Sequence, residues 1–151
     1  MATVDEMSAV VVCSNCGAKN RVPPAASGVP KCGRCHNPLP WVADADDRTF
    51  AEIAEAATIP VLVDLWAPWC GPCHAVSPVL ERLAREMAGR VKLVKVNVDE
   101  SPEVALRFHA QSIPTLLLMR RGIWLAGEER TSLREDLKKI LAMLRGNSCD
   151  P

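Results

Sequence analysis

The chain has 151 residues, of which 18 are basic and 18 acidic, and it contains seven cysteines. This length suits one ordinary domain with a small appendage, and balanced charge without like-charge runs argues against nucleic acid as a partner. No window approaches the roughly 18 apolar residues of a membrane span, and Asp5 and Glu6 stand where a secretory signal would be basic. We therefore expect a cytoplasmic protein without membrane contacts, in which cysteines serve metal binding or redox catalysis rather than structural disulfides.

The composition changes near residue 40. Residues 13–40 are rich in Cys, Gly, Pro and Asn without a helical period, whereas apolar residues after Asp46 recur at helix and strand spacings. We expect a four-cysteine module at 1–40, a second domain at 41–146 and a flexible tail at 147–151. A module of about 40 residues normally needs a metal or disulfides to fold, because it buries little apolar surface.

Two C-x-x-C pairs lie in the first module. Residues 17–31 separate them, which is the spacing of two short turns that present four thiolates to one tetrahedral Zn²⁺. Gly17 and Gly33 are expected to relieve crowding where backbone amides turn toward sulfur. The spacing predicts a zinc-ribbon-like module with one structural zinc ion, held by Cys13, Cys16, Cys32 and Cys35.

The stretch KCGRCH, residues 31–36, has other interpretations. C-x-x-C-H is a haem-attachment motif, but haem attachment normally requires export and would leave Cys13 and Cys16 without a role, so we expect no haem. Redox-active or disulfide-bonded pairs stay open as alternatives. A closed four-sulfur site has no vacancy for His36, which we interpret as an exposed neighbour of Cys35.

Strand and helix patterns alternate along the second domain. Trp41–Ala43 is the predicted first strand, and Thr49 and Glu52 form a capping box that predicts a short helix. The following elements are a buried strand at 60–66 containing Asp64, a helix at 73–89 with a kink at Pro78, a strand at 91–98, a helix at 101–108, strands at 113–119 and 123–128, and a last helix at 132–144. This order predicts an α/β fold, with a mixed central sheet and helices on both faces.

The third C-x-x-C pair, Cys70-Gly-Pro-Cys73, lies where a strand ends and a helix begins. The unpaired amides and the dipole of the helix would stabilise a thiolate on Cys70 and make it nucleophilic. Cys73, one turn further in, would be shielded and suited to resolve a mixed disulfide. Two buried core cysteines, or a further metal site, are the alternatives.

The segment WAPWCGPC, residues 66–73, preceded by Asp64 and followed by Pro78, resembles the active-site segment of thioredoxins. Lys95 and the Ile113-Pro114-Thr motif also match this family, and the resemblance covers about residues 42–146. With four cysteines in front, the chain is similar to the zinc-containing second thioredoxin of bacteria. The resemblance implies a thioredoxin fold and a protein-disulfide reductase whose Cys70–Cys73 disulfide is re-reduced by thioredoxin reductase with NADPH. Its substrates would be disulfide-containing proteins, and we expect a monomer.

The resemblance also implies roles for single residues. Asp64 would be the buried carboxylate beneath the dithiol, and desolvation should raise its pKa and suit it to exchange a proton with Cys73. A purely structural ion pair with Lys95 is the alternative interpretation, and the two can hold together because Lys95 can tune Asp64. Pro114 would be a cis-proline that leaves Ile113 free to pair with a substrate strand, unless it only forms a turn. The implied substrate-contacting residues are Trp69, Gly71, Pro72, Ile113 and Pro114.

The sequence departs from the family at two places. His74 stands where the family usually has Lys or Arg, so the local charge should vary with pH near neutrality. Arg130 occupies the place of a glycine in the substrate surface, which Gly127 fills if the last strand is shorter. The rival functions are a zinc-thiolate redox sensor or holdase-like binding module, and a disulfide isomerase or oxidant. Cys149, in the tail, is interpreted as an incidental thiol.

Overall fold

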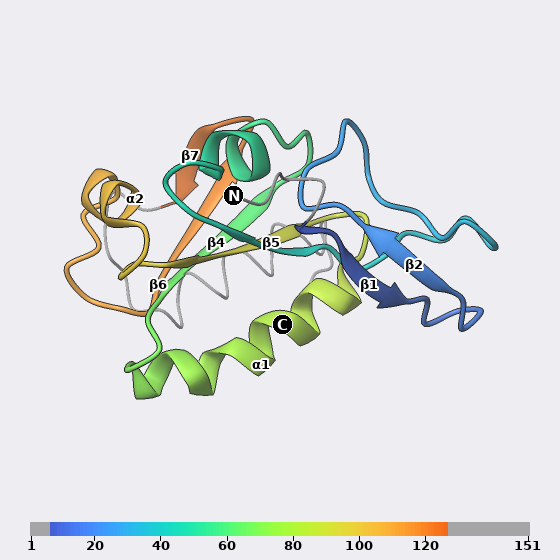
Figure 1. Cartoon of the computed structure of the whole chain (residues 1–151), viewed down its shortest axis with the longest axis horizontal. Coiled ribbons are helices and arrows are strands. Elements are labelled where there is room, and N and C mark those ends of the chain that lie inside the picture. The colour runs from blue at the N-terminus through green and yellow to red at the C-terminus, as the bar shows by residue number, and fades with distance from the viewer. Residues whose placement is uncertain (1–6, 127–151) are drawn as a thin grey trace, which may run out of the picture.

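The computed structural model describes residues 7–126, which contain two β-sheets (Figure 1). One is an antiparallel hairpin of β1 (Ala9–Val12) and β2 (Lys19–Val22). The other has the strand order β3-β5-β4-β6-β7, in which β3, β5 and β4 are parallel and β6 and β7 antiparallel to their neighbours. Its strands are β3 (Val42–Ala45), β4 (Val61–Trp66), β5 (Lys92–Asn97), β6 (Thr115–Arg120) and β7 (Ile123–Ala126).

Helices cover both faces of the five-stranded sheet. The π-helical turn η2 (Ala51–Glu55) and helix α2 (Pro102–Arg107) pack on one face, and helix α1 (Gly71–Glu86) packs on the other. β4 serves both layers because side chains alternate along a strand: Val63 points into the first core and Leu62 into the second. The predicted mixed sheet of a thioredoxin fold is confirmed, and its elements from β3 to β6 begin and end within two or three residues of the predicted ones. The strands β1 and β2 were not predicted.

The predicted capping box at Thr49 and Glu52 is wrong. The pair that forms reciprocal hydrogen bonds lies three residues earlier. The Asp46 carboxylate accepts a hydrogen bond from the Thr49 N–H (3.0 Å), and the Thr49 hydroxyl accepts one from the Asp46 N–H (3.0 Å). Asp46 and Thr49 have the same spacing as Thr49 and Glu52, so the local pattern alone did not distinguish them.

Helix α2 is capped by a residue distant in the sequence. Ser101 is its N-cap residue but makes no side-chain cap bond. The Asp47 carboxylate instead accepts hydrogen bonds from the N–H groups of Glu103 (3.0 Å) and Val104 (2.8 Å). Asp47 therefore ties α2 to the segment that precedes η2, across one face of the sheet.

A buried lysine joins the cysteine hairpin to the five-stranded sheet. Lys92, 1% exposed at the start of β5, donates from Nζ to the carbonyls of Pro24 and Ile53 and lies 3.9 Å from the centre of the Trp41 ring. Trp41 in turn donates from Nε1 to the Pro23 carbonyl (3.0 Å). Burial lowers the pKa of Lys92 to about 7. The segment after β2 is thus bonded to the N-terminal ends of the parallel strands.

The C-terminal ends of the same strands lead to Cys70 and Cys73. Because β4 and β5 are parallel and Lys92 and Asn97 are five residues apart, the two ends of β5 lie about 17 Å from each other. Figure 1 shows the hairpin at one end of α1 and the start of α1 at the other. No helix within residues 7–126 is long and apolar enough to cross a membrane. Four earlier expectations lie outside the described residues: the helix at 132–144, the tail at 147–151 with Cys149, Gly127 and Arg130.

Candidate active site and four-cysteine cluster

The first two C-x-x-C pairs adopt the same turn. In each, the N–H of the first cysteine donates to the carbonyl five residues later (2.8 Å), and the N–H four residues later donates back to that cysteine (2.9 Å). The residue closing each turn has a positive φ: Gly17 at 77° and His36 at 64°. His36 is therefore the structural equivalent of Gly17. Gly33 needs no such conformation, and a Cβ there would meet only Asn20 Oδ1 at 3.8 Å, so the role expected for Gly33 is wrong.

Four sulfurs converge between these turns. Their Sγ atoms all lie within 4.8 Å of one another, with Cys13 and Cys35 at 3.6 Å and Cys16 and Cys32 at 3.5 Å. A tetrahedron with metal–sulfur bonds of about 2.3 Å has edges of about 3.8 Å, close to these separations. All four are free cysteines, and the cluster can bind a metal ion. Disulfide bonding within these pairs, one of the alternatives, is not present.

The surroundings of the cluster favour thiolates on part of it. Backbone N–H groups of Cys35 and Arg34 lower the pKa of Cys32 to about 5. The N–H of Ala18 lowers the pKa of Cys16, but burial and the neighbouring thiols outweigh it and raise that pKa to about 11. Four thiolates at this spacing therefore repel one another unless a cation lies among them.

Asn20, which the sequence analysis did not single out, connects the hairpin to the second cysteine turn. Its Nδ2 lies 3.5 Å from Cys32 Sγ and also donates to the Ala18 carbonyl (3.1 Å). Its Oδ1 accepts a hydrogen bond from the Gly33 N–H (3.0 Å). The side chain thus orients a ligand sulfur from outside the C-x-x-C motif, where spacing alone gives no signal.

The third pair occupies the N-terminus of α1, as predicted. Cys70 is the N-cap residue, and its Sγ accepts a hydrogen bond from the Cys73 N–H (3.2 Å). The two cysteines form a disulfide with a Cα–Cα distance of 5.3 Å. Shielding was expected for Cys73 only, yet both are buried, at 4% and 3% exposed, because Ala67, Trp66 and Ile113 pack around the pair in this oxidised state.

The face around the disulfide carries one large exposed aromatic residue. Trp69 is 70% exposed, and its Nε1 donates to the Asp99 carboxylate (3.0 Å), a partner that the sequence analysis missed. The Ile113–Pro114 peptide bond is cis. His74 Nε2 lies 2.6 Å from the Pro68 carbonyl, which can only accept, so this nitrogen carries the proton.

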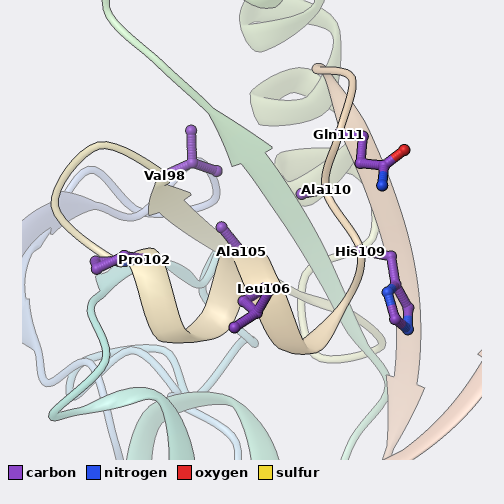
Figure 2. Close-up of a pocket in the computed structure, with 7 residues that line it drawn as sticks. All are labelled: Val98, Pro102, Ala105, Leu106, His109, Ala110 and Gln111. Carbon is purple, nitrogen blue, oxygen red and sulfur yellow. The ribbon is translucent and has the colours of Figure 1, made fainter.

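A pocket of about 350 Å³ adjoins this face (Figure 2). Figure 2 shows Val98 and Pro102 at one end and His109 and Gln111 at the other. Val98 also packs against the buried cluster of Ala67, Cys70 and Cys73, so the pocket adjoins the residues around the disulfide. Its lining residues are Val98, Pro102, Ala105, Leu106, His109, Ala110 and Gln111.

Asp64 is buried on β4, as expected. It is 1% exposed, and desolvation raises its pKa to about 6. Lys95 faces it in register on β5, but the described ion pair of Lys95 is with Glu81 rather than Asp64. One carboxylate oxygen, Asp64 Oδ1, has no hydrogen-bond partner among the described residues.

Known proteins match most of this chain in sequence. The Thioredoxin family matches residues 41–143. Thioredoxin 1 of Nostoc sp. is 42% identical over 103 residues, which are 66% of this chain and 96% of that protein. Thioredoxin C-3 of Corynebacterium nephridii is 36% identical over 146 residues and covers 91% of this chain and 99% of its own length. Thioredoxin of Haemophilus influenzae is 48% identical over 81 residues, 54% of this chain and 76% of that protein.

Proposed function

The chain belongs to the thioredoxin family and is a protein-disulfide reductase, and from this we propose that Cys70 is its nucleophile and Cys73 its resolving thiol. The N-cap of α1 supports this assignment most directly: Cys70 Sγ accepts a hydrogen bond from the Cys73 N–H at the N-terminus of a 16-residue helix. In the reduced enzyme this N–H and the helix dipole stabilise a thiolate on Cys70.

The reaction takes two exchanges at sulfur. The Cys70 thiolate attacks a substrate disulfide, forms a mixed disulfide and releases the first substrate thiolate. The Cys73 sulfur then attacks Cys70 Sγ, closes the Cys70–Cys73 disulfide and releases the second. Cys73 must lose its proton for this step, and Asp64, with a pKa of about 6 raised by burial, is the base we assign to it. Lys95 acts on Asp64 by its charge.

Substrate contact is assigned to the face around the disulfide. The exposed ring of Trp69 offers apolar area, and Gly71 and Pro72 are exposed at the first positions of α1. Pro114 has no N–H, so the backbone of Ile113 is left to pair with an extended substrate segment. The pocket of Figure 2 extends this surface along α2.

Electrons and partners follow from family membership. NADPH is the proposed source, delivered through thioredoxin reductase, and the substrates are disulfide-containing proteins. We place the reaction in the cytoplasm, where free thiols such as those of the four-cysteine cluster persist. We propose that the enzyme acts as a monomer, without nucleic acid or membrane contacts.

One structural Zn²⁺ is proposed for the four-cysteine cluster. The donor set is all sulfur, and the separations between sulfurs suit a tetrahedron, so Cys13, Cys16, Cys32 and Cys35 would hold the ion. When bound, zinc supplies folding free energy to a module too small to fold by packing alone. We assign residues 1–40 to this module and 41–146 to the catalytic domain, followed by the tail at 147–151.

Trapping of mixed disulfides tests the assignment of roles. Cys73→Ser should accumulate adducts with substrate proteins at Cys70, seen by non-reducing electrophoresis and peptide mass mapping, because the resolving thiol is missing. Cys70→Ser is the matched control and should accumulate none. Equal trapping by both variants, or trapping only by Cys70→Ser, would contradict the order of attack. Insulin reduction with NADPH and thioredoxin reductase tests the electron source.

A further inference from the structure

Helix α1 presents a polar stripe to the buried carboxylate. Cys73, Ser77 and Glu81 follow one another at intervals of four, so they lie on one side of α1. Cys73 is buried, Ser77 is half-buried and the Glu81 side chain is 43% exposed, so the stripe runs outward from the disulfide. Asp64 lies in the layer of the sheet that α1 covers, between Leu62 and Trp66 on β4.

The ammonium of Lys95 is held on this stripe. Its Nζ lies 2.7 Å from Ser77 Oγ and 3.5 Å from Glu81 Oε1. It also lies 5.4 Å from the centre of the Trp66 ring. Asp64 Oδ1, by contrast, is buried without a described partner, although Asp64 and Lys95 are paired in register. The lysine therefore reaches past the carboxylate to the helix.

We propose that Ser77 and Glu81 are positioning residues: they retain the Lys95 ammonium on α1 and so leave the Asp64 carboxylate free to take the proton of Cys73. This rests on the proposed role of Asp64 as a base. Neither residue touches the reacting sulfurs in this assignment, and both act through Lys95.

The charges around Asp64 support this arrangement. Burial raises the pKa of Asp64 to about 6, the charge of Lys95 lowers it, and the charge of Glu81 raises it. The facing residue of β6 is Leu116, which carries no charge, and Cys73 on α1 is in the disulfide here. A direct ion pair with Lys95 would hold the pKa of Asp64 lower and make it a poorer acceptor for a thiol proton.

The step is balanced as follows. The S–H proton of Cys73 moves to a carboxylate oxygen of Asp64, and the freed electron pair forms the bond from Cys73 Sγ to Cys70 Sγ. The bond between Cys70 Sγ and the substrate sulfur breaks, and the substrate leaves as a thiolate. The enzyme dithiol is oxidised and the substrate disulfide is reduced.

Carboxyl ¹³C NMR titration of the oxidised full-length protein tests the proposal, since neither active-site sulfur titrates in the disulfide. Asp64→Asn assigns the resonance by its loss. Glu81→Gln should lower the Asp64 midpoint by about half a pH unit, because it removes a charge that raises this pKa and also releases Lys95. Ser77→Ala changes no charge and should shift the midpoint in the same direction only by releasing Lys95 toward Asp64. Lys95→Met should raise the midpoint. Glu86→Gln, an equal change of charge at an exposed position of α1, is the matched control and should leave it unchanged.

Single-turnover kinetics connects the titration to the reaction. The pH midpoint of the resolving step should move with the NMR midpoint in Glu81→Gln. An unchanged or raised Asp64 midpoint in Ser77→Ala overturns the positioning role while the proposed function stands. If Asp64→Asn leaves the rate of the resolving step unchanged, Asp64 is not the base, and the positioning proposal fails even if the titration midpoints shift.

Discussion

The four-cysteine cluster and the Cys70–Cys73 pair share one spacing but not one backbone. In the cluster, each pair lies in a tight turn closed by a residue with positive φ, and Asn20 on β2 bonds the turn between β1 and β2 to the second one. In the third pair, the first cysteine caps a helix of 16 residues. Turns leave four sulfurs converging on one point, whereas the helix N-terminus holds two buried sulfurs in a disulfide. Pairs of the same spacing are thus held by different backbone conformations.

The two sites also lie at opposite ends of the strands of the five-stranded sheet. The cluster packs at the N-terminal ends of the parallel strands and the disulfide at their C-terminal ends. One site should therefore be removable without the loss of the other. Variants that damage a single site test this separation directly.

The largest effect is expected for Cys70→Ser. Insulin reduction should fall by at least about a thousandfold, because the nucleophile is absent and Cys73 has no equivalent cap. The zinc proposed for the cluster should stay at one equivalent, measured by chelator release, since this sulfur lies outside the cluster. Loss of metal together with activity would show that the sites are not separate.

Cys32→Ser should do the reverse. Removal of one of four ligands should lower metal affinity by several kcal/mol and unfold the hairpin, because structural zinc supplies about 10 kcal/mol or more of binding free energy in small modules. Hydrogen exchange of β1 and β2 reads out the unfolding. Insulin reduction should stay within about twofold, and a larger loss would indicate that the module assists catalysis or substrate binding, as the rival function requires.

Asp64→Asn sharpens the comparison within the catalytic site. The pKa of about 6 in the folded protein lies above the ordinary value of 3.8, so the folded state binds more protons between these values and wild-type stability falls as pH rises through them. The free energy of unfolding of the variant should exceed that of the wild type by about 3 kcal/mol above pH 7, and the two should be equal below pH 4. Urea unfolding at pH 8 and pH 3.5 measures both differences. A constant difference would exclude titration of this group.

The smallest effect concerns the two equivalent turns. His36→Gly should stabilise the metal-loaded protein by up to about 1 kcal/mol, because glycine adopts a positive φ without strain. Gly17→Ala should destabilise it by a similar amount. Thermal unfolding of both variants with zinc bound measures the pair. If His36→Gly destabilises the protein instead, the imidazole has a role beyond closing the turn.

Much of the fold could be predicted because its signals are local. Apolar runs marked β4 and β6, and the residues flanking Cys70 marked a helix start. Lys92 was not predicted, because a lone lysine at a strand edge is typical of an exposed residue, and its partners Pro24 and Ile53 are distant in the sequence. Asp47 and Asp99 were missed for the same reason. Ser77 and Glu81 did carry a signal, their spacing of four from Cys73, which becomes meaningful only once the facing strand is known.

Lys92 gives the junction between hairpin and sheet a chemical reporter. Its amine is enclosed by two carbonyls and an indole ring, whereas Lys19 and Lys31 are exposed to solvent. Burial lowers the pKa of Lys92 to about 7 only while the amine is covered, so an uncovered Lys92 reacts as an exposed lysine does. Acylation of this one nitrogen, followed by mass spectrometry, would therefore count how often the hairpin lifts off the sheet.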